Sequence, residues 1–537
     1  MNGMTNLLAF PALGVWLLMP VALVLLTAYS AWTSSPLKLR HCWRMAKGLL
    51  VLSLAASALI GLLLVLQAMT GGTALTEAGL RFGLQPDGLS VWMAMLVSFI
   101  GVVILHYADR YLQGDHGHQR FLPWFLATLA CVLLLVFTAN LLVIAFAWVG
   151  SSLALHHLLT LYQDRPAARQ AAFQKFLASR VGDVCVLAGV LLLYSHYQTF
   201  SLPQIYQLAG AGNASGAGLQ LASVLFAIAA LLKCAQIPFH GWLIRVMEAP
   251  TPVSALLHAG LINLGGFLWL RLYPGFEGFT PGHMLLILVG GASAVIAVLV
   301  MMTQTSVKHA LAWSTCAQMG FMLFEIGLGA YTLALLHLMA HSLYKAHSFL
   351  GAGRTVAISE TWSAPTGNGI PQVLMAAVTV AAAAGLLWLA PGMVEKNPVV
   401  GLLLLFAIAS SVLTVPAGAG WRVVVLAGAG GLLLLPLYAG LTALLAPALP
   451  APANISLPPT ALAAGFGLLA VLVLASALIR FLPALAVTRW LRGHSANGFY
   501  LELAFDRLTA RVHAAGQAGA YPRPGTSART DLMEERG

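Results

Sequence analysis

Long apolar runs separated by short polar loops dominate this chain. Runs of about 20 residues recur along most of its 537 residues, and a helix of that length spans a bilayer. Backbone groups in lipid must pair within the segment, and the runs lack the polar–apolar alternation of a barrel strand, so helices are predicted. The 15 predicted spans cover residues 7–28, 48–69, 88–107, 122–138, 141–161, 176–196, 219–237, 253–273, 283–303, 309–329, 331–352, 371–390, 398–417, 421–443 and 461–483.

Basic residues fall in alternate loops between these spans. Lys and Arg mark the cytoplasmic side of membrane proteins. The odd-numbered loops and the exit from the last span carry Lys38, Arg40, Arg44, Lys47, Arg110, Arg120, Arg165, Arg169, Lys175, Arg245, Lys308, Arg354, Arg422, Arg489 and Arg492. The even-numbered loops hold few, with Arg81 and Lys396 as exceptions. The pattern predicts a periplasmic N-terminus and a cytoplasmic C-terminus.

Composition supports an all-α, polytopic membrane protein. The chain is 60% hydrophobic and 8% charged, whereas soluble domains carry about 25% charged residues. The net charge of +11 follows the loops, so it indicates topology rather than nucleic-acid binding. Five scattered cysteines form no CxxC pair, and no phosphate loop, dinucleotide fingerprint or nucleophile elbow is present. We therefore expect no metal, no cofactor and no enzymatic chemistry in this chain.

The segment HLMAHSLYKAHSFL places three titratable groups on one helical stripe. His337, His341 and Lys345 stand at i, i+4 and i+8, within an arc of roughly 80° and over about 12 Å of helix. A charge at the bilayer centre costs at least about 2.5 kcal/mol, so these groups need water, each other or a function. Their spacing predicts a proton relay, and the alternative is a structural hydrogen-bond ladder between helices.

A second candidate is a broken helix around Lys233. Pro238 follows five residues later, and residues 219–248 as one helix would measure about 45 Å, too long for a bilayer. Broken helices line many transporter ion sites, so Lys233 is predicted at the break, in the ion pathway. The alternative is a lysine that extends toward the cytoplasm.

Two polar residues follow this break. Glu248 precedes the breaker Pro250-Thr251-Pro252, and His258 lies early in the next span. Both are candidates for the ion pathway, although Glu248 in such a place also fits a helix cap.

Three further positions carry charge in or near spans. Arg180 and Asp183, at i and i+3, predict an ion pair that modulates Lys233 or is purely structural. Lys308 either connects the two halves of a pathway or belongs to the positive-inside pattern. Glu325 is isolated in the sequence, either a relay member or a group at the outer interface.

The C-terminal part divides into two segments. Residues 497–513 place Leu501, Phe505, Leu508 and Val512 on one face, which predicts a helix on the membrane surface or against a partner. The segment from 514 is rich in Gly, Pro and charge, so we expect disorder there.

The stretches KCAQIPFHGWLIRVMEAPTPVSALLHAG and HLMAHSLYKAHSFL resemble signature segments of the antiporter-like family. That family includes the largest antiporter-like subunit of respiratory complex I and subunits of multi-component cation/proton antiporters. The resemblance covers roughly residues 85–400 and implies two inverted five-helix repeats with broken helices. It implies that Lys233 and Lys345 are the central lysines of the two halves, with His258 beside Lys233. The implied regions are 1–120 (spans 1–3), 121–275 and 276–417 (the repeats), 418–484 (C-terminal spans), 485–513 (cytoplasmic amphipathic segment) and 514–537 (disordered tail).

The chain departs from respiratory members at one informative position. Their fifth span carries a functional glutamate in a Trp-Glu-Gly context, whereas this chain reads Trp148-Val149-Gly150. No long lateral helix follows the last spans, and the span-12 lysine of the family has no clear counterpart, because Lys396 lies too close to the outer surface.

The finer pattern, EAPTPVSALLHAG with LINLGGF, SSLALHHLLTLY and YKAHSFL, resembles the membrane subunits of DAB inorganic-carbon-accumulation complexes. That resemblance implies a bacterial inner-membrane protein with a large zinc-binding, carbonic-anhydrase-like partner on the cytoplasmic side. It implies that flow of H+ or Na+ is coupled to conversion of CO2 to bicarbonate, with the zinc in the partner. Two alternatives stay open: a subunit of a respiratory oxidoreductase or multi-subunit cation/proton antiporter, and a non-conducting anchor for a soluble partner.

Overall fold

The computed structural model describes residues 2–33, 35–162, 166–276, 278–353, 370–390, 397–416, 418–450 and 455–520. Within these ranges the chain is helical, and β pairing is limited to isolated bridges between Leu84 and Thr138 and between Asn140 and Ser201. Lys396 and Arg354 lie outside the described residues, as does the predicted disordered tail from residue 521 on.

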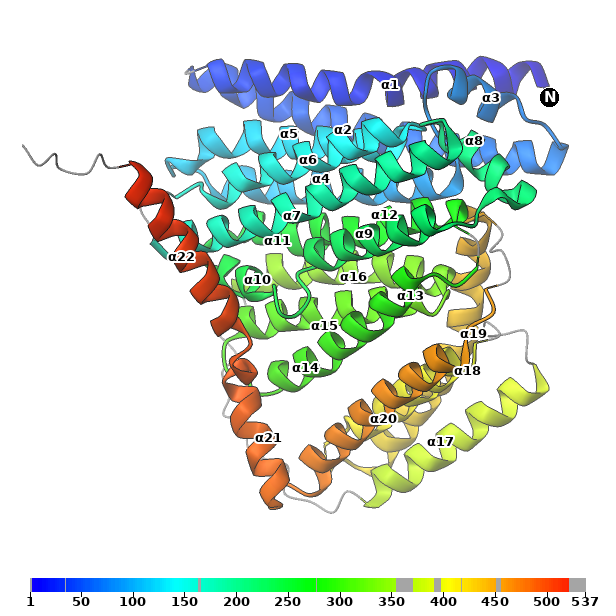
Figure 1. Ribbon diagram of the computed structural model, residues 1–537, viewed down its shortest axis with the longest axis vertical. Helices are drawn as coiled ribbons and strands as arrows, with labels where there is room; N and C mark the ends of the chain where they lie inside the picture. Colours follow the sequence, from blue (N-terminus) through cyan, green and yellow to red (C-terminus); the bar gives the residue numbers. More distant parts are fainter. Residues whose placement is uncertain are drawn as a thin grey trace, which may run out of the picture.

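Most helices run side by side along one direction, as horizontal rods in Figure 1. The long or paired helices of this bundle are α1 (Asn2–Trp32), α2 (Pro36–Thr70), α4 (Gly88–Tyr111), α5 (Gly117–Phe137), α6 (Leu141–Leu159), α7 (Pro166–Tyr197), α9 (Ala217–Lys233), α11 (Thr251–Ala259) with α12 (Leu264–Leu272), α13 (Pro281–Leu285) with α14 (Gly291–Met301), α15 (Val307–Gly327), α16 (Tyr331–Gly351), α17 (Ile370–Leu389), α18 (Pro398–Leu413), α19 (Trp421–Leu445) and α20 (Pro459–Phe481). Short helices α3 (Ala74–Arg81), α8 (Leu202–Leu208) and α10 (Gly241–Arg245) lie between them.

Each of the 15 predicted spans matches a helix or a broken pair of helices in this bundle. Eleven helices among the described residues are long and apolar enough to cross a membrane, and α9 and α18 are shorter apolar helices. Helices α15 and α16 are 21 residues long and carry the polar groups of the predicted relay. The polytopic all-α prediction is confirmed, and the division into two inverted repeats stays a prediction.

Two predicted loops are shorter than expected. Helix α2 begins at Pro36, so the basic residues assigned to the first loop lie in its first turns. Helix α7 begins at Pro166, ten residues before the predicted start, so Lys175 lies inside a helix instead of a loop. Both helices begin in polar segments that precede the apolar runs from which the spans were predicted.

The predicted break after Lys233 is confirmed. Helix α9 ends at Lys233, and Ala235 adopts a left-handed φ of 51°, which a residue with a Cβ rarely does. Pro238 has no N–H to continue the helix, and the chain restarts only at Gly241 in α10. A second break separates α11 from α12, where Gly260 has φ −125° and ψ −72° between two helical segments.

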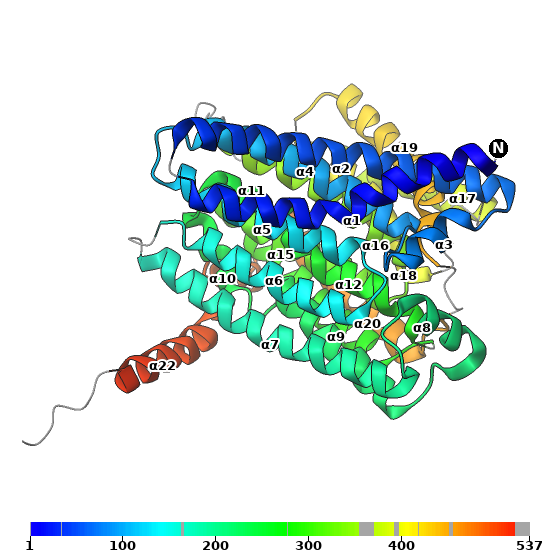
Figure 2. The ribbon, with the colours of Figure 1, turned by 90° about the horizontal axis from the view of Figure 1, so that it is seen from above.

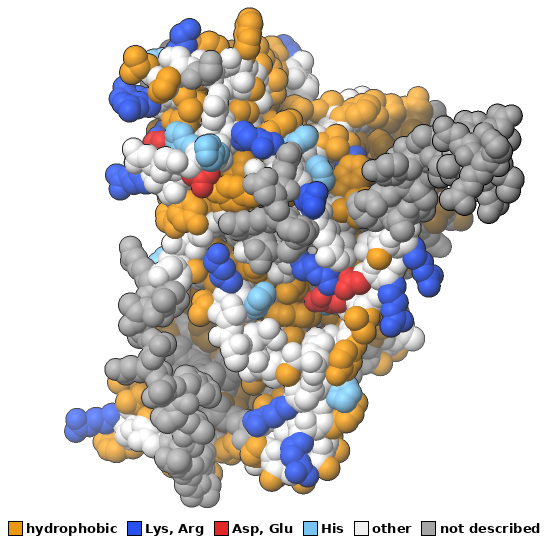
Figure 3. All heavy atoms as spheres, turned by 90° about the vertical axis from the view of Figure 1, so that its left-hand side faces the viewer, with side chains coloured by type: hydrophobic (Ala, Val, Ile, Leu, Met, Phe, Trp, Pro, Cys, Tyr) orange, Lys and Arg blue, Asp and Glu red, His pale blue; other side chains and the backbone are white. Residues whose placement is uncertain are grey.

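Chain direction alternates, so the basic loops collect at one end of the bundle. We call this the basic end; it carries the α1–α2, α4–α5, α6–α7 and α14–α15 connections together with α10. Basic side chains are spread over this end, which faces the viewer in Figure 3. The opposite end carries α3, α8 and the α15–α16 turn.

A single apolar core joins α1 through α16 and includes Leu445 at the end of α19, whereas α17, α18 and α20 pack through smaller clusters. The predicted site residues lie within the body that this large core holds together. Helices α17, α18 and α20 form a separate group at the bottom of Figure 1.

The C-terminal segment lies across the basic end. Helix α21 (Ala486–Ala496) and helix α22 (Glu502–Ala520) run transverse to the bundle, and α22 reaches beyond it (Figures 1 and 2). The predicted helix over 497–513 begins only at Glu502, because Phe499 and Tyr500 have positive φ angles. It continues to Ala520, so the expectation of disorder from 514 was wrong for 514–520.

The predicted apolar face of α22 is largely exposed, and its packing on a membrane surface or a partner stays a prediction. Phe505 is 6% exposed, but Leu508 is 53% exposed and Val512 is 43% exposed. Glu502, Asp506 and Thr509 meet the body instead, because Arg245 and Gln174 offer them charged and polar partners.

Candidate functional site

The first polar cluster lies at the break of α9. The Lys233 ammonium donates to the hydroxyl of Ser151 on α6 at 3.3 Å and lies 4.4 Å from the centre of the Trp148 ring. The position at the end of α9 places a lysine among apolar helices, where a hydroxyl and an aromatic face are its direct contacts. A cation–π contact and one hydrogen bond offset only part of the free-energy cost of removing an ammonium group from water.

The predicted Arg180–Asp183 pair forms on α7 beside this lysine. Arg180 Nη2 lies 2.6 Å from Asp183 Oδ2, and Asp183 is 4% exposed. A cavity of about 10 Å³ separates Asp183 from Lys233, lined also by Trp148, Ser152 and Gly182. A water molecule needs roughly that space, so the cavity fits one water between the carboxylate and the lysine.

Lys175 is a site residue that the sequence prediction missed. It is 3% exposed, and its ammonium donates to the carbonyl oxygen of Ser152 at 2.5 Å and to the Ser152 hydroxyl at 3.1 Å. Arg180 donates to the same hydroxyl at 3.3 Å. The adjacent Ser151 and Ser152 on α6 therefore connect Lys175 and Arg180 on α7 with Lys233 on α9.

The charges of this cluster do not balance. Lys175, Arg180 and Lys233 are three basic groups against one carboxylate, Asp183, and Val149 stands where respiratory members have a glutamate. Uncompensated charge in a low-dielectric interior costs several kcal/mol per ion. Any change in the protonation of one lysine therefore changes the energy of the others, which is the coupling a proton relay needs.

The second polar cluster follows the predicted stripe of α16. Lys345 is completely buried and donates to the carbonyl oxygen of Leu311 at 2.9 Å. His341 is 4% exposed, and neither of its ring nitrogens has a hydrogen-bond partner in the described part of the chain. The His337 and His341 rings lie 6.3 Å apart. The three groups thus share one buried stripe.

Glu325 extends this stripe and is not isolated in the fold. Its carboxylate oxygens lie 3.0 and 3.2 Å from Nδ1 of His337. The contact crosses the turn between α15 and α16.

His258 lies against the second half rather than beside Lys233. It is completely buried, its Nδ1 is 3.0 Å from the Thr315 hydroxyl on α15, and its ring stacks on Phe349 of α16 at 4.3 Å. Helix α11 packs against α16, so His258 makes its contacts there and none with Lys233 among the described residues. His258 therefore belongs to the cluster around Lys345.

The remaining predicted site residues, Lys308 and Glu248, belong to neither cluster. Lys308 begins α15 at the basic end, half-buried, and makes no hydrogen bond or ion pair with another described residue. Glu248 closes the short helix η2 (Val246–Glu248), and its side chain lies outside the described residues. Within the ranges that the structure describes, no three His, Cys, Asp or Glu side chains could hold a metal ion together.

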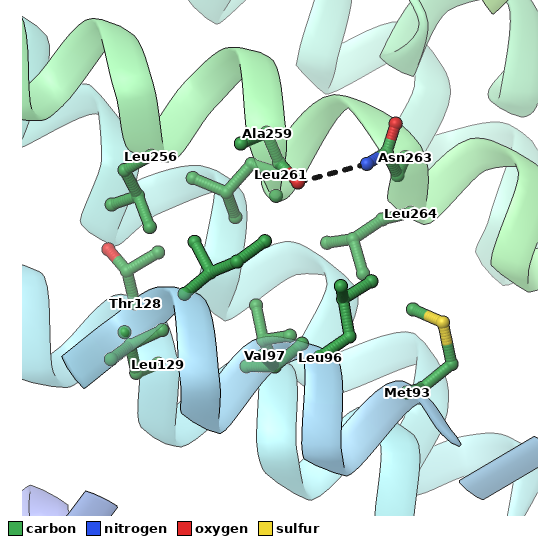
Figure 4. A pocket seen from close by; sticks show the side chains of 14 residues that line it. Met93, Leu96, Val97, Thr128, Leu129, Leu256, Ala259, Leu261, Asn263 and Leu264 are labelled. Carbon is green, nitrogen blue, oxygen red and sulfur yellow. Dashed lines mark hydrogen bonds between the residues drawn. The ribbon is translucent and has the colours of Figure 1, made fainter. Parts of the chain in front are cut away.

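An apolar cavity lies next to the second helix break but apart from both clusters. It measures about 20 Å³ and is lined mainly by leucine, valine and methionine side chains of α4, α5 and α11–α12 (Figure 4). Asn263 closes its polar edge by donating to the Ala259 carbonyl at 3.1 Å and to the Ser342 hydroxyl at 2.6 Å. Cavities with such linings stay dry, so this one is not a polar pathway.

The two clusters are separate in this structure. No hydrogen bond or ion pair among the described residues joins the Lys233 cluster to His258 or the α16 stripe. His240, in the loop after α9, is completely buried, packs 4.9 Å from the Trp313 ring and lies 3.9 Å from Glu502 of α22. The arrangement is two buried basic clusters, one at a broken helix and one on a continuous helix.

A multi-pass helical bundle with buried lysines and histidines at such places defines a class of ion-translocating membrane subunits. A family model described as the transmembrane part of NADH:quinone oxidoreductase and the Mrp antiporter matches residues 138–422, more than half of the chain. A model for the N-terminus of chain 5 of complex I matches residues 74–122. The chain belongs to this family of antiporter-like membrane subunits.

Several relatives and one solved structure agree with that assignment. The "Probable inorganic carbon transporter subunit DabB" of Hydrogenovibrio crunogenus is 41% identical over 70% of this chain and 71% of its own length. The NAD(P)H-quinone oxidoreductase chain 5 of Picosynechococcus is 34% identical over 52% of this chain and 42% of its own. A chain of the Mrp complex from Dietzia is similar in fold, with a TM-score of 0.51 at 22% identity, over 96% of this chain and 59% of that one.

Proposed function

We propose that this chain conducts protons through its two buried clusters and couples their flow to inorganic carbon accumulation. The observation that carries the proposal is the α16 stripe, where Glu325, His337, His341 and Lys345 lie in one buried row inside a membrane-length helix pair. Histidines exchange protons near neutral pH, and lysine needs only partial desolvation to do so. Sodium ions are the alternative cargo; buried amines and imidazoles, which cannot ligate Na+ while protonated, favour protons.

The carbon-accumulation role rests on the similarity to DabB, over about 70% of both chains. We propose a bacterial inner-membrane location with the basic end in the cytoplasm, the N-terminus in the periplasm and the C-terminus in the cytoplasm. The catalytic partner would be a large carbonic-anhydrase-like subunit on the cytoplasmic side that holds the zinc and converts CO2 to bicarbonate. This chain would need no metal ligands of its own.

The energy available from protons is sufficient for this role. One charge crossing 100 mV releases about 2.3 kcal/mol. Since about 1.4 kcal/mol corresponds to a factor of ten, one proton supports roughly a 50-fold gradient.

A growth experiment with central-lysine variants tests the proposal. In a host that depends on this complex for growth at ambient CO2, Lys233→Ala and Lys345→Ala should each abolish growth, because each removes the amine of one cluster. Lys38→Ala, at an exposed lysine of the basic end, should grow normally. Normal growth of both central-lysine variants, with the complex assembled, would refute the transport mechanism and favour a membrane anchor.

A respiratory or multi-subunit antiporter role is the second candidate, supported by the similarity to chain 5 of NAD(P)H-quinone oxidoreductase. The absence of a glutamate at Val149 argues against it, because the respiratory pattern pairs that carboxylate with the first lysine. Co-purification separates the two: a zinc-binding carbonic-anhydrase-like protein supports the first role, and quinone-oxidoreductase or antiporter subunits support the second.

A further inference from the structure

We infer that Glu325 is the group through which the α16 stripe exchanges protons with the side of the membrane opposite the basic end. This inference rests on the proposed function, since it assigns the inlet of the same pathway. The sequence left two roles open for this glutamate, and the family resemblance assigns it none.

Glu325 stands at the correct end of the stripe. It lies two residues before the end of α15 at Gly327, next to the turn that leads into α16 at Tyr331. Lys308, at the basic end of the same helix, is 17 residues away, about 26 Å along the helix. Along α16 the order from the basic end is Lys345, His341, His337, and Glu325 continues that order toward the opposite end.

The contact with His337 has the geometry of a proton-exchanging pair. Both carboxylate oxygens lie within 3.2 Å of Nδ1, and the Glu325 side chain is 5% exposed while that of His337 is 13% exposed. The other ring nitrogen of His337, Nε2, has no hydrogen-bond partner among the described residues. The imidazole therefore has one nitrogen on the carboxylate and the other free to pass a proton along the stripe.

The transfer balances in protons and charge. A proton from water at the opposite end converts the Glu325 carboxylate to a neutral carboxylic acid. The acid passes this proton to Nδ1 of neutral His337, which makes the ring cationic and restores the carboxylate. Nε2 then gives up its proton along the stripe, and the neutral ring returns to its first tautomer by proton exchange with water.

A purely structural ion pair that fastens α15 to α16 is the competing explanation. A glutamine in place of Glu325 keeps the shape and a hydrogen-bond acceptor for Nδ1 but cannot take up a proton. An aspartate keeps the titratable group on a shorter side chain. A structural pair tolerates glutamine at least as well as aspartate, whereas a proton inlet tolerates only aspartate.

Proton flux into vesicles tests the inference. The complex, purified with its partners and reconstituted in liposomes with an internal pH dye, is driven by a potassium diffusion potential. Glu325→Gln should lower the flux at least about tenfold, as expected for loss of a proton-transfer group, and Glu325→Asp should restore most of it. Glu77→Gln, at an exposed glutamate of α3 on the same end, should leave the flux unchanged and serves as the matched control.

The result that overturns the inference is parental flux in Glu325→Gln while Lys345→Ala is inactive. Parental flux in Lys345→Ala and Lys233→Ala as well would instead refute the proposed function. Should Glu325→Gln fail to assemble, His337→Gln decides, because it removes the imidazole that accepts protons from the carboxylate. A tenfold loss in that variant supports the inlet, and parental flux excludes it.

Discussion

At the residue scale, the first cluster contains more basic side chains than carboxylates to neutralise them. Lys175, Arg180 and Lys233 share one acid, Asp183, and two adjacent serines. In a respiratory member the glutamate of the fifth span would supply a second acid, and here Val149 takes its place. The first cluster therefore has lysine and serine groups to exchange protons where its relatives have a glutamate–lysine pair.

Lys175 is predicted to feed this cluster from the basic end. Lys175→Met keeps the apolar stem and removes the ammonium, so proton flux should fall at least about tenfold if protons pass through it. Vesicle flux measures the effect, and Lys38→Met, at an exposed lysine, is the control. Unchanged flux in Lys175→Met would assign Lys175 to packing and to the hydrogen bonds with Ser152 alone.

At the element scale, a polar clamp holds α22 across the basic end. Arg245 binds both oxygens of Asp506 at 2.6 Å and Glu502 at 3.1 Å, and Gln174 donates to Asp506 at 2.8 Å. Gln174 precedes Lys175 on α7, so the clamp joins the C-terminal helix to the element that carries the first cluster. Phe505 adds an edge contact with Phe239 in the loop after α9, at 5.3 Å.

Removing Arg245 should release α22. Hydrogen bonds to charged groups contribute about 1.5–3 kcal/mol each, and about 2 kcal/mol corresponds to roughly 30-fold in the opening equilibrium of a local segment. In Arg245→Ala, amide hydrogen exchange in residues 502–512 should accelerate by that factor. Arg507→Ala, at an exposed arginine of the same helix, should not change it. Equal exchange in both variants would contradict the clamp.

The ionisation of Asp506 and Glu502 determines the pH range over which the clamp stabilises α22. Partial burial alone would raise the pKa of Asp506, but hydrogen bonds from Arg245 and Gln174 outweigh it and lower the pKa below 3.8. A lowered carboxyl pKa contributes stability above the unfolded pKa, and that contribution is lost as pH falls through the folded pKa. Burial raises the pKa of Glu502 despite the attraction of Arg245. The pH dependence of stability that comes from Glu502 therefore has the opposite sign to that from Asp506. The Arg245–Asp506 pair therefore stays ionised at neutral pH.

Sequence reasoning predicted the elements better than their contacts. The 15 spans were predictable because a chain that crosses lipid must form long apolar helices. The break after Lys233 was predictable because Pro238 cannot continue a helix. The pairing of Glu325 with His337 did not follow, because the face that α15 turns toward α16 is set by packing across the turn. The contact of α22 with Arg245 did not follow either, because that arginine lies more than 250 residues earlier in the chain.

At the scale of the whole molecule, the two clusters lie in one continuous apolar core, and no described contact joins them. His258 on α11 and the buried His240 each contact α15, through Thr315 and Trp313. Proton transfer from one cluster to the other therefore needs water molecules between them. If each cluster conducts protons on its own, no such water is needed. The clamped α22 extends over the basic end, where the proposed partner would bind (Figure 2).

Proton flux through vesicles that contain the purified complex tests the central claim most directly. The parent protein should acidify or alkalinise the lumen in the direction of an imposed potential. Lys233→Ala and Lys345→Ala should each lower the rate at least about tenfold, because each removes a buried proton-carrying amine. Flux at the parental rate in both variants would show that the buried amines carry no protons.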